Sequence, residues 1–320
     1  MKRLIFKCAL LLFIVGTILY LGGAAYKRTN TYVNLERTEA TDIFRTMPDS
    51  IDIAVFGASH GRDAFRCPPE GYTMFNFSLS SQPPYYDLRL MREYQDHIQP
   101  GALVVLTVSP MYPFFTVQPA ADSFTKIQPR YYRILSPENI VDLDIWYWLR
   151  VRFSPLLTED FAKISKAFLE PPDLVPTMDQ SVGQRQLSPE DIPGEKERIH
   201  RNHIAPGITC FPEESPVMAD AYREMLALCQ EKGWQAVLVT PPYPKDYLDC
   251  YIEYDPSFFI GLNQFMDRLC QEYGVDWLDY SQDPVFAERY DLYKNIDHLN
   301  LKGAAVFNRQ FFADVQSLGL

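Results

Sequence analysis

The chain of 320 residues has few cysteines, and their spacing suits no structural framework. Six are present, no two form a Cys-x-x-Cys pair, and Cys8 lies in a long apolar run, which leaves an odd, widely spaced set of five. This pattern fits neither a disulfide-rich domain nor a zinc site, although it leaves one or two bridges open. We therefore expect no metal site, and nothing in the sequence indicates a cofactor.

Basic residues are also in the minority. The chain has 30 Lys and Arg against 41 Asp and Glu, a net charge of −11. Residues 1–28 hold five of the basic residues and none of the acidic ones, so the rest has 25 against 41, a net charge of about −16. A field of that sign repels nucleic acids and other anionic polymers. Nucleic-acid binding is therefore disfavoured.

Charge is absent altogether from the run Cys8–Tyr26. As a helix, this run is long enough to cross a hydrocarbon core of roughly 30 Å. Basic residues precede it, which favours an orientation with the N-terminus inside. We predict a retained anchor at 1–28, with membrane contact over 4–26, in a single-pass protein of the cell membrane whose C-terminal domain is extracytoplasmic. A cleaved signal peptide is the main alternative, because LGGAAY offers small residues to a signal peptidase. A buried helix of a soluble protein is another.

Five short apolar runs predict the strands of a sheet. They are too continuous for half-exposed strands, which favours a parallel sheet covered on both faces. Helical patterns separate most of them, and two of these patterns end on Gly233 and Gly274, residues typical of a helix C-terminus. The predicted fold is α/β, a flavodoxin-like three-layer α/β/α sandwich with a parallel five-stranded sheet. The predicted strands are 51–56, 72–77, 102–108, 235–240 and 275–280, and the helices 85–98, 217–233, 258–274 and 301–318.

Two segments fall outside this alternation. Residues 29–49 indicate a polar neck between the anchor and a main domain at 50–320. An insertion at about 111–212 is rich in proline and aromatic residues and then polar, and we interpret it as a helical cap plus a long loop. Its aromatic cluster, Trp146 to Phe153, could pack on the core, line an acyl pocket or touch the membrane.

Polar side chains follow the ends of the first three strands. Ser59 comes shortly after the first, Ser78 begins a serine-rich loop after the second, and Ser109 follows the third. The carboxyl ends of the strands in an open α/β sheet are where reacting groups collect. His298 stands directly before the last predicted helix. A serine and a histidine on loops at one sheet edge can form a nucleophile–base pair.

The segments VFGASHGRDAF, NFSLSSQ, LTVSPMY and DHLNLKGAAVF together resemble the SGNH (GDSL-like) hydrolase superfamily. The branch they most resemble is the membrane-anchored one that includes the D-alanyl-transfer protein of the lipoteichoic-acid pathway. The resemblance covers about 50–110 and 213–320, plus the anchor. It implies that Ser59 is the nucleophile, that His298 is the general base and that the backbone amide of Ser78 donates to an oxyanion.

The resemblance also implies a substrate and a partner. The substrate would be a cell-surface glycopolymer, and the partner a multispanning membrane-bound O-acyltransferase that delivers the acyl group. Four further residues are candidates for oxyanion or substrate binding because they lie on the same loops: Ser81, Gln82, His60 and Ser109.

Two positions depart from the family pattern. Ser109-Pro110 stands where the family often has an asparagine, and Asn295 stands where an aspartate usually lies three residues before the histidine; the aspartate here is Asp297, next to His298. An asparagine oxygen can accept the hydrogen bond from the imidazole N–H but supplies no charge, and in a serine protease the Asp-to-Asn change costs about 10⁴ in turnover. Neighbours on an extended chain point to opposite sides, so Asp297 needs a bend to reach the ring.

Three arrangements follow from that departure. Asn295 orients His298, or Asp297 or another acid substitutes, or the site is impaired. His60 either contacts substrate or is an exposed residue that starts a helix. His200 and His203 have a spacing that metal ligands can use, but without an acidic or cysteine partner we interpret them as solvated loop residues.

These observations predict a membrane-anchored extracytoplasmic serine O-acyltransferase that modifies a cell-surface glycopolymer through an acyl-serine intermediate. An SGNH esterase or deacetylase of envelope polysaccharide would use the same residues. A catalytically impaired glycan-binding or assembly protein is the third alternative. The anchor and the insertion favour transfer over hydrolysis.

Overall fold

The computed structural model describes residues 1–116, 122–169, 173–174, 185–205 and 207–319. The chain forms two compact units. One combines Met1–Thr46 with Lys126–Met178, and the other combines Met47–Thr125 with Asp179–Leu320. The predicted insertion is therefore divided between the two units.

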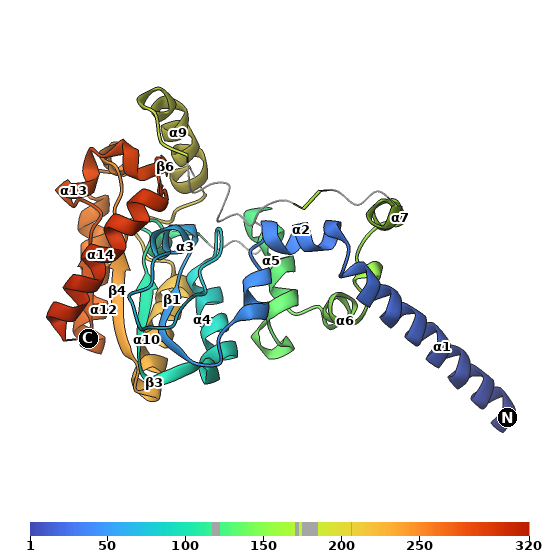
Figure 1. Cartoon of the computed structure of the whole chain (residues 1–320). Coiled ribbons are helices and arrows are strands. Elements are labelled where there is room, and N and C mark those ends of the chain that lie inside the picture. The colour runs from blue at the N-terminus through green and yellow to red at the C-terminus, as the bar shows by residue number, and fades with distance from the viewer. Residues whose placement is uncertain (117–121, 170–172, 175–184, 206, 320) are drawn as a thin grey trace. The chain divides into compact units, whose positions relative to one another are not determined.

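The larger unit is built on a five-stranded parallel sheet with the strand order β2-β1-β3-β4-β5 (Figure 1). This order is the flavodoxin-like one. The prediction of an α/β fold with a parallel five-stranded sheet is confirmed, and each strand overlaps one of the predicted apolar runs, although β3 begins at Ile98, where a helix was expected to end. The strands are β1 (Ile51–Phe56), β2 (Met74–Asn76), β3 (Ile98–Thr107), β4 (Gln235–Thr240) and β5 (Asp276–Asp279).

Helices join the strands and cover both faces of the sheet. Two of them, α10 (Pro216–Lys232) and α12 (Phe258–Tyr273), end as predicted on Gly233 and Gly274, whose φ angles of 69° and 64° are left-handed. A hairpin of β6 (Tyr293–Asn295) and β7 (His298–Leu299) precedes the last helix. The helices of this unit are α3 (Ser59–Ala64), α4 (Pro84–Tyr94), α9 (Ile192–Ile199), α10 (Pro216–Lys232), α11 (Lys245–Tyr254), α12 (Phe258–Tyr273), α13 (Pro284–Ala287) and α14 (Leu301–Leu318).

The core lies on the two faces of the sheet. Successive strand residues point to opposite faces. Val55, Val105 and Val237 form one buried row, and Phe307 and Phe311 of α14 belong to the same buried cluster. The strand residues that alternate with these point to the other face, where α10 packs against α4 and α12. Truncating a buried phenylalanine to alanine typically costs about 3–5 kcal/mol, so α14 is held firmly on the sheet.

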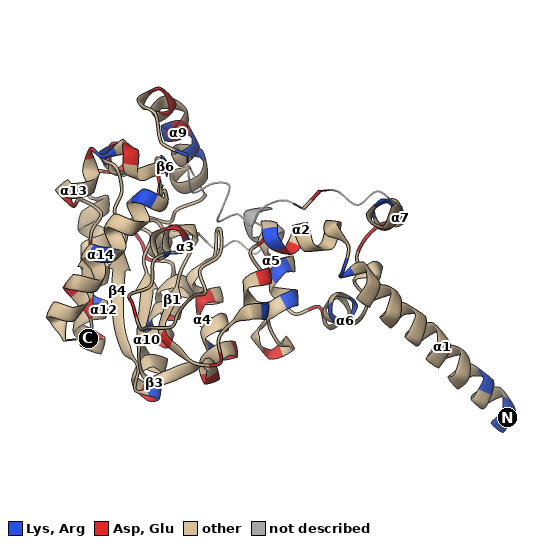
Figure 2. Cartoon of the chain, in the orientation of Figure 1, with Lys and Arg blue, Asp and Glu red and all other residues tan. Residues whose placement is uncertain are grey.

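The smaller unit is helical. It contains α1 (Lys2–Tyr26), α2 (Asn30–Thr38), most of α5 (Asp122–Ile134), α6 (Ile145–Phe153) and α7 (Phe161–Leu169). Among the described residues, α1 alone is long and apolar enough to cross a membrane, as an anchor or a signal sequence, and none of its apolar window is buried. Figure 2 shows the charges of α1 confined to its N-terminal end.

The predicted neck is partly helical. Thr29 accepts a hydrogen bond from the amide of Tyr32 at 3.3 Å and so caps α2, and a 3₁₀ turn follows at Asp42–Thr46. Tyr26, Tyr32 and Ala167 form a small buried cluster that joins α1, α2 and α7. All six cysteines lie in the described residues and each is free.

Candidate active site

Two glycines position Ser59, the first residue of α3. Gly57 follows β1 with a φ of 145°, a conformation that L side chains rarely adopt, and a Cβ there would collide with Thr107 Oγ1. A Cβ on Gly61 would collide with the same hydroxyl. Because glycine has no side chain at positions 57 and 61, α3 can lie directly against the end of β3. This close approach holds Ser59 at the carboxyl edge of the sheet.

The β6–β7 hairpin positions His298. Asn295 pairs with His298 across the hairpin, and residues 296–297 form the turn. Asn300 then caps α14, where its Oδ1 accepts from the amide of Gly303 at 2.9 Å. The side-chain nitrogen of Asn300, Nδ2, donates to the backbone carbonyl of Asp291 at 2.9 Å. Asn300 therefore locks the hairpin onto the start of α14.

Ser59 and His298 meet at hydrogen-bonding distance. The Oγ of Ser59 lies 2.8 Å from Nε2 of His298, although 239 positions separate them in the chain. The other ring nitrogen, Nδ1, lies 2.9 Å from Oδ1 of Asp297 and 3.0 Å from Oδ1 of Asn295. A hydroxyl, an imidazole and an orienting acceptor in this order form the arrangement that activates a serine.

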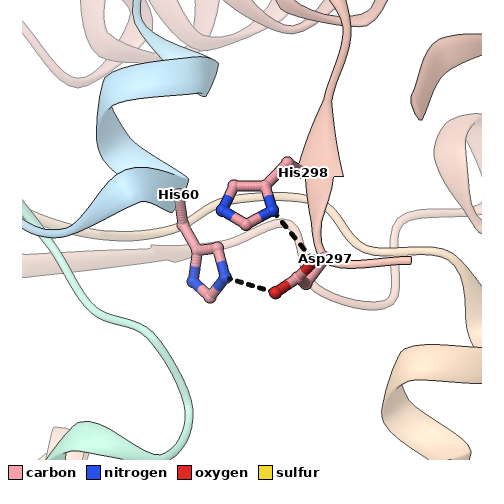
Figure 3. A group of neighbouring side chains, drawn as sticks. All are labelled: His60, Asp297 and His298. Atoms are coloured by element: carbon pink, nitrogen blue, oxygen red, sulfur yellow. Dashed lines mark hydrogen bonds and ion pairs between the residues drawn. The ribbon is translucent and has the colours of Figure 1, made fainter. Parts of the chain in front are cut away.

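Both residues that the sequence offers as partners of His298 reach its ring. Asp297 does so because the chain reverses at residues 296–297, so the opposite-side rule for extended neighbours does not apply. Figure 3 shows the Asp297 carboxylate directed towards His298 with one oxygen and towards His60 with the other. Asp297 adds the negative charge that Asn295 lacks.

Asp297 is ionised although its side chain is only 2% exposed. Burial acts to raise the pKa of this carboxyl, but His298 and His60 outweigh burial and hold the pKa well below its usual range. The guanidinium of Arg198 adds a two-pronged contact, with N–O distances of 2.5 Å and 3.3 Å. The carboxylate therefore stays charged and has both oxygens engaged.

His60 lies behind Asp297. Its Nε2 is 3.6 Å from Oδ2 of Asp297, and its Nδ1 lies 2.6 Å from Ser109 Oγ and 3.0 Å from the hydroxyl of Tyr243. Burial lowers the pKa of His60, which favours the neutral ring. With Nδ1 accepting from a hydroxyl, the remaining N–H sits on Nε2 and faces Asp297. The expectation that His60 is exposed is wrong: it is a buried group that holds the carboxylate.

The residues after β2 brace the site. The amide of Ser78 donates to Oδ1 of Asn76 at 3.0 Å, so this proton is already engaged within the loop. Gln82 is buried, and its Nε2 lies within hydrogen-bonding distance of the Gly57 carbonyl at 3.1 Å. Ser81 is exposed and has a left-handed φ of 53°. These contacts tie the loop after β2 to Asn76 and to the carbonyl of Gly57.

An ion cluster ties α3 to the hairpin. Asp63 is a fully buried residue of α3, and Lys294 Nζ of β6 lies 2.6 Å from its carboxylate. Arg62 and Arg66 also contact Asp63. Burial acts to raise the pKa of Asp63, but Arg62, His298 and Lys294 together hold it far below its usual range. Three cations around one carboxylate join the elements that bear Ser59 and His298.

Sequence reasoning missed the groups that surround Asp297 from the other side. Arg198 comes from α9, and His203 follows in a π-helical turn, His200–Ile204. His203 is buried, its Nδ1 lies 3.1 Å from the hydroxyl of Tyr251, and burial lowers its pKa to about 3. The prediction of a solvated His203 is therefore wrong. The spacing of Tyr247 and Tyr251 on one face of α11 was the available signal for a buried polar cluster.

His60, Asp297 and His298 offer ligand atoms that lie within 4.8 Å of one another and could hold a metal ion. Two contacts disfavour that use. The guanidinium of Arg198 already occupies the carboxylate, and Nε2 of His298 faces Ser59. A divalent cation would sit beside a fixed positive charge, so the arrangement suits proton transfer better.

No protein-family model matches the chain, and no curated protein matches it. The chemistry of the site is therefore inferred from its own geometry.

Proposed function

We propose that the chain is a membrane-anchored, extracytoplasmic serine O-acyltransferase that modifies a cell-surface glycopolymer. The observation that carries the proposal is the alignment of Ser59 Oγ, the two nitrogens of His298 and the buried carboxylate of Asp297. The α/β sheet supports it, because Ser59 follows the carboxyl end of parallel strand β1, at the edge where open sheets bind ligands.

In the first half-reaction, Ser59 Oγ attacks the carbonyl carbon of an acyl donor while Nε2 of His298 takes the hydroxyl proton. The ring then carries a positive charge, which the Asp297 carboxylate stabilises. The tetrahedral intermediate collapses, the bond from carbon to the donor's leaving group breaks, and His298 returns the proton to that group. The product is an ester on Ser59.

In the second half-reaction a hydroxyl of the glycopolymer replaces the leaving group. His298 takes its proton, the hydroxyl oxygen attacks the acyl carbon, and the bond to Ser59 Oγ breaks as the proton returns to Oγ. The backbone amide of Ser59 supports the oxyanion in both halves, since the first amides of a helix have no intrahelical acceptor. The Ser78 amide would first have to leave Asn76.

The apolar helix α1 favours transfer over hydrolysis. It would keep the enzyme beside a multispanning membrane acyltransferase that supplies the acyl group, the partner that the SGNH-like segments imply. A soluble esterase of envelope polysaccharide would have no such requirement. The two activities differ only in whether a sugar hydroxyl or water resolves the acyl-serine.

The test uses the full chain in detergent with p-nitrophenyl acetate as donor and a polyol as acceptor. We expect intact mass to show one acetyl group on Ser59, and we expect the polyol to accelerate p-nitrophenol release and to become acetylated. Ser59→Ala should remove the acetyl group, whereas Ser317→Ala, an exposed serine near the C-terminus, should retain it. Turnover without acetylated polyol would favour the esterase. No acyl-serine on folded protein would favour a binding protein.

A further inference from the structure

Large apolar side chains are exposed together on the segment 145–169 of the smaller unit. Trp146 is 72% exposed, Phe161 83% and Leu169 79%. Phe153 and Leu157, between them in the chain, are exposed as well. Apolar side chains exposed singly need no explanation, but a contiguous group marks a binding surface. Trp146, Phe153 and Leu157 line one groove against α1, and we call these three residues the apolar face.

The apolar face is continuous with α1. Oγ of Ser154 donates to the carbonyl of Leu19 at 2.9 Å, and Lys27 Nζ donates to the carbonyl of Arg152 at 2.7 Å. The backbones approach closely where α1 has glycine: a Cβ on Gly23 would lie 2.9 Å from Ser154 Cα. Figure 1 shows α6 beside the C-terminal part of α1. The segment that bears the apolar face is therefore packed on α1.

These contacts fix the depth of the segment. Leu19 lies seven residues before Tyr26, about 10 Å along a helix that rises 1.5 Å per residue. With the uncharged run of α1 placed in hydrocarbon, whatever packs on Leu19 lies inside the same leaflet. An apolar groove of ≈ 550 Å³ between α1 and α6 reaches further along α1, with Gly16 and Trp146 in its lining.

The polar groups of the segment suit a membrane interface. Arg150 lies with its guanidinium carbon 5.7 Å from the ring centre of Tyr147, and Arg152 stacks similarly on Trp148 at 5.5 Å. Lys163 on α7 is exposed. Tryptophan, tyrosine and long basic side chains gather at the boundary between hydrocarbon and headgroups. The apolar part of each side chain lies there in lipid, and its polar or charged end lies in water.

We propose that α6 and the turn that follows it, Pro155–Leu157, insert into the leaflet that holds the C-terminal half of α1, and that lipid covers the apolar face. The protein would then be attached by a spanning helix and by an interfacial segment locked to it. This goes beyond the proposed catalytic function and does not depend on it. The glycines of LGGAAY, which suit a signal peptidase, serve here as the close-packing positions of α1, which supports a retained helix.

The experiment reconstitutes the full chain in vesicles made with brominated phosphatidylcholine, whose bromines quench tryptophan fluorescence on contact. The chain has four tryptophans, and Trp234 and Trp277 belong to the larger unit. We expect strong quenching in the parent chain and a marked reduction in Trp146→Phe, with Trp148 of the same helix accounting for the quenching that remains. The matched control Trp277→Phe removes an unquenched indole, so the quenched fraction should rise or stay constant.

Two results would overturn the proposal. One is equal quenching in the parent chain and Trp146→Phe. The other is quenching of Trp146 by aqueous acrylamide but not by brominated lipid, which would show that the apolar face lies in water and is a site for a protein. Because Trp→Phe keeps an aromatic ring at an exposed position, misfolding is not expected, and cosedimentation with the vesicles together with the circular dichroism spectrum checks it.

Discussion

Replacing Asp297 by asparagine separates the two partners of His298. The change is isosteric and removes one negative charge from a side chain that is 2% exposed. In a serine protease the same change costs about 10⁴ in turnover, or roughly 5.4 kcal/mol. Here Asn295 Oδ1 remains 3.0 Å from Nδ1 and can keep the ring oriented. A neutral hydrogen bond contributes about 1 kcal/mol, so we expect a loss of about 10³.

Asn295→Ala should cost far less. It removes a neutral hydrogen bond of about 0.5–1.5 kcal/mol, which corresponds to a loss of roughly 2- to 13-fold. Asp297 still holds the ring at 2.9 Å and still supplies the charge. The two variants should therefore differ by about 100-fold in the second-order rate constant for reaction of Ser59 with a fluorophosphonate.

Folding must be controlled, because Asp297→Asn also leaves Arg198 without its carboxylate. Breaking a buried ion pair costs about 3–5 kcal/mol of stability, and less where one partner is part-exposed, as Arg198 is. The double variant Asp297→Asn/Arg198→Gln removes both charges and should recover stability without recovering the rate. A tenfold greater loss in Asn295→Ala than in Asp297→Asn would refute the assignment of Asp297 as the main partner.

Three further predictions concern stability. Burial places the pKa of His203 at about 3, below the unfolded value of about 6.5, so protons bind the unfolded state preferentially as pH falls below 6.5. The free energy of unfolding should therefore drop by about 2 kcal/mol from this group between pH 7 and pH 5, and His203→Gln should flatten that part of a urea-unfolding series. Gly61→Ala should lower the free energy of unfolding by about 1–3 kcal/mol, because its Cβ would overpack against β3. Gly194→Ala has open space at its Cβ and should stabilise α9 by up to about 1 kcal/mol. Thermal unfolding of the two variants compares these effects. Gly23→Val should loosen segment 145–169 and speed its tryptic cleavage roughly tenfold in detergent. Gly16→Val should not, because a Cβ at Gly16 has no other atom within 4 Å. Equal cleavage of the two variants would count against the packing of this segment on α1.

The sheet could be predicted because its signals are local. Five continuous apolar runs marked the strands, and the two glycine-ended helices have the left-handed C-caps expected of them. Ser59 and His298 were recognisable because each sits in a short segment at a strand end or before a helix. The structure brings them together because the antiparallel β6–β7 hairpin carries His298 to the edge where β1 ends, a property of the topology rather than of either segment.

The surroundings of Asp297 could not be predicted, since they depend on contacts between distant segments. Arg198 is 99 positions from Asp297 in the chain, and Tyr243 is 183 positions from His60. The bend that turns Asp297 towards His298 depends on a two-residue hairpin turn, which the alternation rule for strands does not anticipate. The packing of residues 126–169 with the N-terminal helices is likewise a long-range property.

The most direct test of the account is whether Ser59 is an activated nucleophile. The full chain in detergent is treated with a fluorophosphonate and examined by intact mass and peptide mapping, beside Ser59→Ala and His298→Ala. We predict one adduct, located on Ser59, absent from the first variant and strongly reduced in the second. Folded protein that takes up no adduct, or that is labelled equally without His298, would contradict the proposed chemistry.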